Sequence, residues 1–163
     1  TYVRLQELGD ENPLTVNRIM YTIHKKDARL IKNIGSKRFG MQLLLRGIYI
    51  HNDLFYIHVS LSNSSNVNFD IDHIRFRIAD RKVAKRTALQ ETFVEPVRAY
   101  NAIAAVKAGE TLRNVYVFQK FTIPDDKVLI MDVFEKNGGR HQSFMIQNTD
   151  LVDAHTVEEL KIR

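Results

Sequence analysis

Residues 55–61 read Phe55-Tyr56-Ile57-His58-Val59-Ser60-Leu61, with a large apolar side chain at every second position. Successive side chains of a β-strand point to opposite faces, so this spacing predicts a strand with one buried face. Two further runs repeat the pattern: Ile74–Ile78, where arginines stand between the apolar residues, and Val115–Phe121. These three runs predict strands that each place one face on a common core.

Two other segments, Met41–Ile50 and Lys127–Glu135, are apolar at most positions, as in strands that are covered on both faces. Short runs of residues that favour reverse turns separate the predicted strands. These runs are 51–53, 63–66, 80–82, 124–126 and 137–139. The turns fit antiparallel pairing, and roughly seven to nine short strands at this spacing favour a sandwich or barrel over βαβ units. The predicted fold is therefore mostly β, an antiparallel β-sandwich of the immunoglobulin-like kind over residues 41–152.

The segment before residue 41 has a helical period instead. Apolar residues recur at helical spacing at Val16, Ile19, Met20 and Ile23, and again at Leu30, Ile31 and Ile34. Thr15 is the expected N-cap and Gly35 the expected stop, which predicts one helix or a broken pair. Residues 1–40 are expected to be a helical lead-in that packs on the sandwich or links to it. Residues 153–163 are expected to be a short C-terminal helix or tail.

The composition argues against most catalytic chemistry. The chain has 163 residues, 44% hydrophobic and 26% charged, and no cysteine, which excludes disulfides, thiolate nucleophiles and cysteine metal sites. No two of the six histidines have the spacing of a helical metal pair. In Asp70-Ile71-Asp72-His73 the histidine of a strand would point away from both carboxylates. With no nucleophile-elbow or phosphate-loop motif either, we expect no catalytic, metal or cofactor residues, and a protein that is not an enzyme.

The strongest local feature is basic. Six cations stand against the single acid Asp80, an excess equal to the chain's net charge of +5: Arg75, Arg77, Arg81, Lys82, Lys85 and Arg86. If the apolar residues of Ile74–Ile78 face the core, Arg75 and Arg77 share the outer face, and Lys85 extends a basic stripe there. Such a stripe suits a solvated strand face, an acidic protein or peptidoglycan surface, or nucleic acid. Nucleic acid is the least favoured, because no aromatic residues interleave with the cations.

Two more pairs of residues are candidates for partner contacts. Tyr56 and Tyr116 lie on the polar side of their strands and could form an exposed interface patch, although most strand aromatics are expected in the core. Arg140 and His141 follow the Asn137-Gly138-Gly139 turn and are expected near solvent at its end. Arg140 and His141 join the six cations of the stripe in the candidate partner-binding set.

Several motifs in fixed order carry a family resemblance. They are Ile34–Gly40, Gly47–Tyr49, Asn63–Asn66, Phe69–Asp72, Lys82–Ala88, Arg98–Tyr100, Lys120–Asp126 and Glu135–Phe144. Together they resemble the C-terminal domain of TraN, a protein of Bacteroides-type conjugative transposons, from about Glu7 to about Val152. The motifs Lys82–Ala88 and Asn137–Phe144 are candidate contact or structural segments.

The resemblance implies a structural subunit of a conjugative, type IV secretion-like DNA transfer apparatus, with a β-sandwich fold. It implies contacts with other conjugation proteins, homo-oligomerisation within the assembly and membrane association through partners. The expected location is the periplasm or the outer membrane, with a signal peptide upstream of this fragment. The alternative is a DNA-contacting accessory factor that uses the basic strand face. The family has no catalytic residues to assign here.

Overall fold

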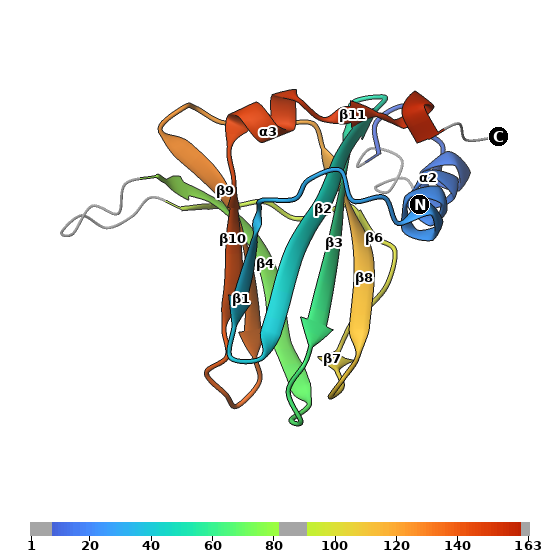
Figure 1. Ribbon diagram of the computed structural model, residues 1–163. Coiled ribbons are helices and arrows are strands. Elements are labelled where there is room, and N and C mark those ends of the chain that lie inside the picture. Colours follow the sequence, from blue (N-terminus) through green and yellow to red (C-terminus); the bar gives the residue numbers. More distant parts are fainter. Residues whose placement is uncertain (1–7, 82–90, 161–163) are drawn as a thin grey trace.

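The computed structural model describes residues 8–81 and 91–160, which form two facing β-sheets and an N-terminal helix (Figure 1). The six-stranded sheet has the order β1 (Gly35–Arg38), β2 (Met41–His51), β3 (Leu54–Asn63), β8 (Thr111–Gln119) and β6 (Arg98–Ala99), with β11 (His155–Thr156) parallel to β2. The five-stranded sheet has the order β10 (Gln142–Ile146), β9 (Lys127–Glu135), β4 (Phe69–Asp80) and β5 (Thr92–Phe93), with β7 (Ala105–Val106) beside β4. The predicted mostly β, antiparallel sandwich with an N-terminal helical segment is confirmed.

The main core lies between the two sheets. Phe55, Ile57, Val59 and Leu61 of β3 all enter it, as their alternation predicts. Phe76 of β4 meets the rings of Tyr116 and Phe118 edge to face, with centroids 5.1 and 4.8 Å apart. Edge-to-face contacts of this kind add to the burial of the rings.

Both faces of β3 and β8 are buried, so the prediction of one buried face for these two strands is wrong. The helix α2 (Pro13–Lys26) covers the outer face of the six-stranded sheet with Val16, Ile19, Met20 and Ile23. Tyr56 lies under this helix and Tyr116 lies between the sheets, and both side chains are buried. The exposed interface patch expected at these two tyrosines does not form.

The helix is shorter than its apolar period indicates. It begins after Asn12, whose side chain accepts a hydrogen bond from the Leu14 backbone N–H at 2.8 Å, so the N-cap is not Thr15. It ends at Lys26, with Asp27 left-handed at φ 49°. The Leu30 and Ile31 backbone N–H groups both donate to the carbonyl of Arg46, where β2 bulges. These contacts hold residues 27–34 off the helical path, and β1 follows directly.

A charged cluster lies under the C-terminal end of α2. Asp27 Oδ1 forms ion pairs with two arginines, at 2.9 Å from Arg46 Nε and 3.2 Å from Arg113 Nη1. His58 of β3 is fully buried beneath them, with Nε2 3.9 Å from Asp27 Oδ1, and neither ring nitrogen has a hydrogen bond among the described residues. Burial lowers the pKa of His58 to about 4. Asp27 acts to raise this pKa, whereas the neighbouring Arg46, Arg113 and His24 lower it further.

Short turns and C-terminal elements complete the sandwich. Asn52 and Asp53 take positive φ between β2 and β3, and Asn137 does so between β9 and β10, as their turn residues predict. After β10 come the short helix α3 (Asn148–Val152), β11 and the 3-10 helix η1 (Val157–Leu160). Val157 and Leu160 pack into the cluster under α2. The C-terminal segment therefore helps to cover the same sheet face as the helix.

Candidate functional site

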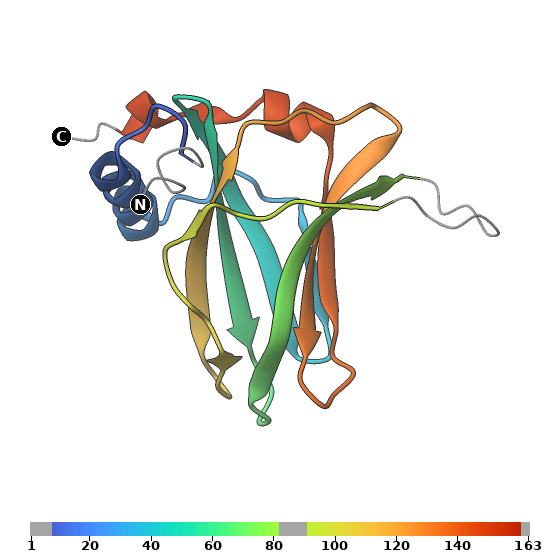
Figure 2. The same ribbon diagram turned by 180° about the vertical axis from the view of Figure 1, so that it is seen from behind.

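The outer face of the five-stranded sheet holds the predicted arginines. β4 turns Phe76 into the core and pairs Arg75 with Asp132 and Arg77 with Ile130 of β9, so both arginines lie on the outer face, as predicted. The same face carries residues of four neighbouring strands: His73, Phe93, Phe134, His141 and Met145. Figure 2 shows that no described helix lies over this sheet, whereas α2 lies beside the other one.

Asp132 organises the centre of this face. Its carboxylate has no exposed surface, and its Oδ2 accepts from Arg75 Nε at 3.0 Å and from Arg77 Nε at 2.7 Å. Its Oδ1 lies 3.3 Å from His141 Nε2. Arg77 is held again by Glu91, with Nη1 to Oε1 at 2.7 Å. A buried carboxylate is stable only when paired and hydrogen-bonded in this way.

The electrostatics of the cluster leave little free positive charge. Burial alone would raise the pKa of Asp132, but the hydrogen bonds from Arg77 and Arg75 outweigh it, so the pKa lies below its ordinary value. Hydrogen bonding to Asp132 likewise raises the pKa of Arg77. The two arginines are therefore fixed and matched by the two carboxylates Asp132 and Glu91. The basic stripe expected at Arg75 and Arg77 is an internally neutralised cluster.

Aromatic rings surround the cluster. Phe134 lies between two histidine rings, with centroids 4.5 Å from His73 and 4.5 Å from His141. The Arg75 guanidinium lies 4.8 Å from the Phe134 ring centre and 5.5 Å from that of Phe93. Phe93 and Met145 remain about half exposed, at 53% and 57%. The face thus combines fixed polar groups with exposed apolar side chains, a composition typical of interface cores.

The remaining cations of the predicted stripe lie apart from this cluster. Arg81 is exposed and donates its backbone N–H to the carbonyl of Asp126. Lys82, Lys85 and Arg86 lie outside the described residues. The described residues carry as many acidic as basic side chains, so the net charge of +5 resides in the remaining segments.

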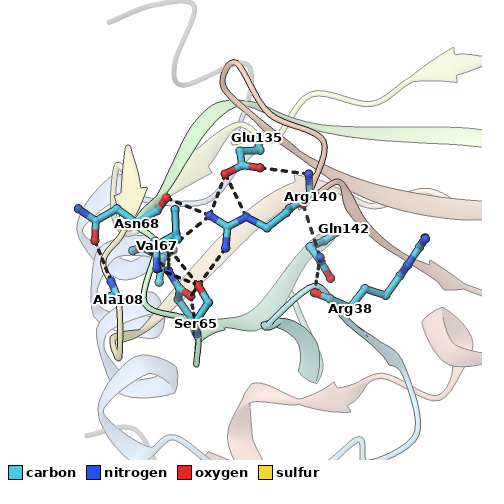
Figure 3. Close-up of polar contacts among 10 residues, drawn as sticks. Arg38, Ser65, Val67, Asn68, Ala108, Glu135, Arg140 and Gln142 are labelled. Atoms are coloured by element: carbon cyan, nitrogen blue, oxygen red, sulfur yellow. Dashed lines mark hydrogen bonds and ion pairs between the residues drawn. The ribbon is translucent and has the colours of Figure 1, made fainter.

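Arg140 is a structural residue, and its expected position near solvent is wrong. Figure 3 shows its guanidinium between the β9–β10 turn and the β3–β4 turn. Nε and Nη2 donate to Glu135 Oε2 at 3.1 and 2.8 Å, Nη1 donates to Ser65 Oγ at 3.0 Å, and Nη2 also donates to the Asn68 carbonyl at 2.9 Å. These hydrogen bonds lower the pKa of Glu135. Only His141 of this pair faces outward, with 43% of its side chain exposed.

Several motifs of the family resemblance meet at this end of the sandwich. Gln142 donates to the Arg38 carbonyl at 3.1 Å and accepts from Ser36 Oγ at 2.8 Å, which ties β10 to β1 (Figure 3). Gly40 has φ +75°, and a Cβ there would lie 2.9 Å from Ser65 Cβ. Segments 34–40, 63–66 and 135–144 therefore join the two sheets. The residues of these three motifs therefore have structural roles at this end of the sandwich.

Sequence reasoning missed Asp132 and the aromatic residues around it. Asp132 stands in a run that is otherwise apolar from Val128 to Phe134, and a lone acid in such a run signals a buried, paired carboxylate. The sequence does not indicate a role for Phe93, because the apolar residues around it show neither a helical nor a strand period. Over residues 8–81 and 91–160 no cluster of three metal-ligating side chains is found, and no helix is long and apolar enough to cross a bilayer.

Comparison with known proteins gives a family match. The family described as "Domain of unknown function (DUF4138)" matches residues 13–156, from the start of α2 to the end of β11. The matched range includes both sheets and the outer face described above. No curated protein matches the chain.

Proposed function

The chain belongs to the DUF4138 family, and we propose that it is a non-enzymatic structural subunit of a conjugative DNA-transfer apparatus that binds other transfer proteins. The resemblance of its motifs to TraN proteins of Bacteroides-type conjugative transposons supports this setting. The proposal places the domain in the periplasm or at the outer membrane, associated with the membrane through its partners. Homo-oligomerisation within the assembly belongs to the same proposal.

The outer face of the five-stranded sheet, over which no described helix lies (Figure 2), is the observation that carries the proposal. Phe93 and Met145 are exposed apolar side chains there, and the ion cluster around Asp132 holds the neighbouring polar groups in fixed positions. Rigid polar groups lose little conformational entropy when a partner binds, which favours recognition of a defined protein surface.

The alternative, a DNA-contacting factor, would use the same strand face on phosphates. Phosphate binding needs cations whose charge is not already matched. Arg75 and Arg77 are matched by Asp132 and Glu91, which supports a protein partner over DNA for this face.

The test replaces the two exposed apolar residues. The Phe93→Asp/Met145→Asp variant is expected to lose co-purification with the other transfer proteins and to keep the unfolding midpoint of the wild type within a few degrees. Val152→Asp is the control, because Val152 is an exposed apolar residue that lies on α3 and not on this face. Charge reversal at Arg75 or Arg77 is a poor test, since it would disrupt the buried Asp132 as well. Unchanged co-purification of the double variant would refute the proposal.

A further inference from the structure

A second surface of the domain is basic. Residues 13–39, named here the basic segment, contain seven cations against the single acid Asp27: Arg18, Lys25, Lys26, Arg29, Lys32, Lys37 and Arg38. The segment comprises α2, the extended stretch after it and β1. Its cationic excess is larger than that of residues 75–86, and the sequence alone could have revealed it.

The charge of the basic segment is not neutralised within the described residues. All seven cations are exposed, and none forms an ion pair with a described acid. Asp27, the only acid within the basic segment, forms ion pairs with Arg46 and Arg113 of the sheet. Exposed like charges that remain unpaired attract a partner of opposite charge over about 8–10 Å.

The basic segment also exposes apolar side chains. Half of the exposed large hydrophobic residues of the described chain lie in it: Leu14, Tyr21, Leu30 and Phe39. Leu14, Arg18, Tyr21 and Lys25 are three or four residues apart, so they share the solvent face of α2. Lys25 Nζ lies 5.7 Å from the Tyr21 ring centre, and the Arg38 guanidinium lies 4.8 Å from that of Phe39.

Ordinary structural roles explain only part of this surface. Lys25 and Lys26 stabilise the C-terminal end of α2 through the helix dipole. Lys37 and Arg38 protect the edge strand β1 from pairing with another sheet. Neither role requires Arg18, nor the exposure of Leu14 and Tyr21 on the helix.

The part of the basic segment on α2 lies away from the candidate site described above, whereas β1 adjoins β10 (Figure 1). Figure 1 shows α2 beside the six-stranded sheet, and the chain running from it across to β1. The outer face of the five-stranded sheet lies on the other side of the sandwich. One domain can therefore contact different molecules through the two surfaces.

We infer that the basic segment binds an acidic protein segment that also carries apolar side chains. This inference rests on the proposed function, since it supplies the same subunit with a second protein partner. Leu14 and Leu30 offer nothing to phosphates or stacked bases, but they suit the apolar side chains of a protein. A membrane surface is disfavoured because the apolar face of α2, with Val16, Ile19 and Ile23, is already buried on the sheet.

The test places the photocrosslinking amino acid p-benzoylphenylalanine at position 21 of the full-length protein, in cells that carry the transfer apparatus. Mass spectrometry then identifies the crosslinked molecule and the crosslinked peptide. We expect a protein peptide with a clear excess of Asp and Glu. A nucleic-acid adduct, a lipid adduct, a peptide without acidic excess or no adduct would each overturn the inference.

Charge variants then measure the contribution of the basic segment to binding of the identified peptide. The Arg18→Glu/Lys25→Glu variant is expected to raise the Kd roughly tenfold. Added salt should reduce this difference from the wild type. Lys107→Glu/Lys136→Glu is the matched control with the same charge change at exposed cations elsewhere, and should bind as the wild type does. Equal weakening in both variants would overturn the inference. If position 21 gives no adduct while the Phe93→Asp/Met145→Asp variant loses its partners, the inference fails and the proposed function stands.

Discussion

Replacing His58 by leucine tests the packing of α2 on the sheet. His58 is buried without a hydrogen bond, so the folded protein keeps its ring neutral. Its pKa is about 4 in the folded state against 6.5 for an unperturbed histidine. Below pH 6.5 the unfolded chain therefore binds a proton that the folded protein does not. The stability present above pH 6.5 is lost as the pH falls toward 4.

The magnitude follows from the two pKa values. Each pKa unit of difference corresponds to about 1.36 kcal/mol. The titration of His58 should therefore lower the free energy of unfolding of the wild type by about 3 kcal/mol between pH 7 and pH 4. His58→Leu fills a similar volume and does not titrate. The free energy of unfolding of the wild type should therefore fall by about 3 kcal/mol more than that of the variant over this range.

Urea unfolding followed by circular dichroism at several pH values measures the difference, since the chain has no Trp for fluorescence. His73→Gln is the control, because it removes a half-exposed histidine that lies on the other sheet, away from α2. Parallel profiles for the wild type and His58→Leu would show that His58 is not held neutral under α2. That result would refute the described packing of the helix.

Two further predictions concern the ion pairs of the five-stranded sheet and its turns. Asp132→Asn should lower the free energy of unfolding at pH 7 by about 2–3 kcal/mol, because it removes the carboxylate that Arg75 and Arg77 share and leaves only Glu91 beside Arg77. Urea unfolding measures the change, and a change below about 0.5 kcal/mol, the usual range for surface substitutions, would contradict the cluster. Arg140→Lys should lower the free energy of unfolding by about 2 kcal/mol, since an ammonium cannot replace the forked hydrogen bonds to Glu135 and the turn. Thermal unfolding measures this loss of stability. Arg81→Lys is the control and is expected to unfold as the wild type does.

The strands of the sandwich could be predicted because their apolar period is local. Ile74–Ile78 correctly places Arg75 and Arg77 outward, since alternation along one strand decides its faces. The second buried face of β3 could not be predicted in the same way. It depends on α2, which lies far away in sequence and covers residues whose own spacing suits solvent.

The candidate site was only partly predictable for a similar reason. Asp132 lies 57 residues from Arg75, and nothing near the arginines in sequence indicates that they are neutralised. Arg140 was expected near solvent because it follows a turn, yet its partners come from the β3–β4 turn, more than 70 residues earlier. Leu30 and Ile31 continue a helical period, but hydrogen bonds to the bulge at Arg46 outweigh that local preference.

The most direct test of the proposed function is photocrosslinking from Phe93, on edge strand β5 of the five-stranded sheet. Phe93 is replaced by p-benzoylphenylalanine in the full-length protein, in cells with an active transfer apparatus, and the adducts are identified by mass spectrometry. We predict an adduct with another protein of the apparatus, and loss of that adduct when Met145→Asp is added. An adduct with DNA, or no adduct in cells that transfer DNA normally, would contradict a protein-binding role for this face.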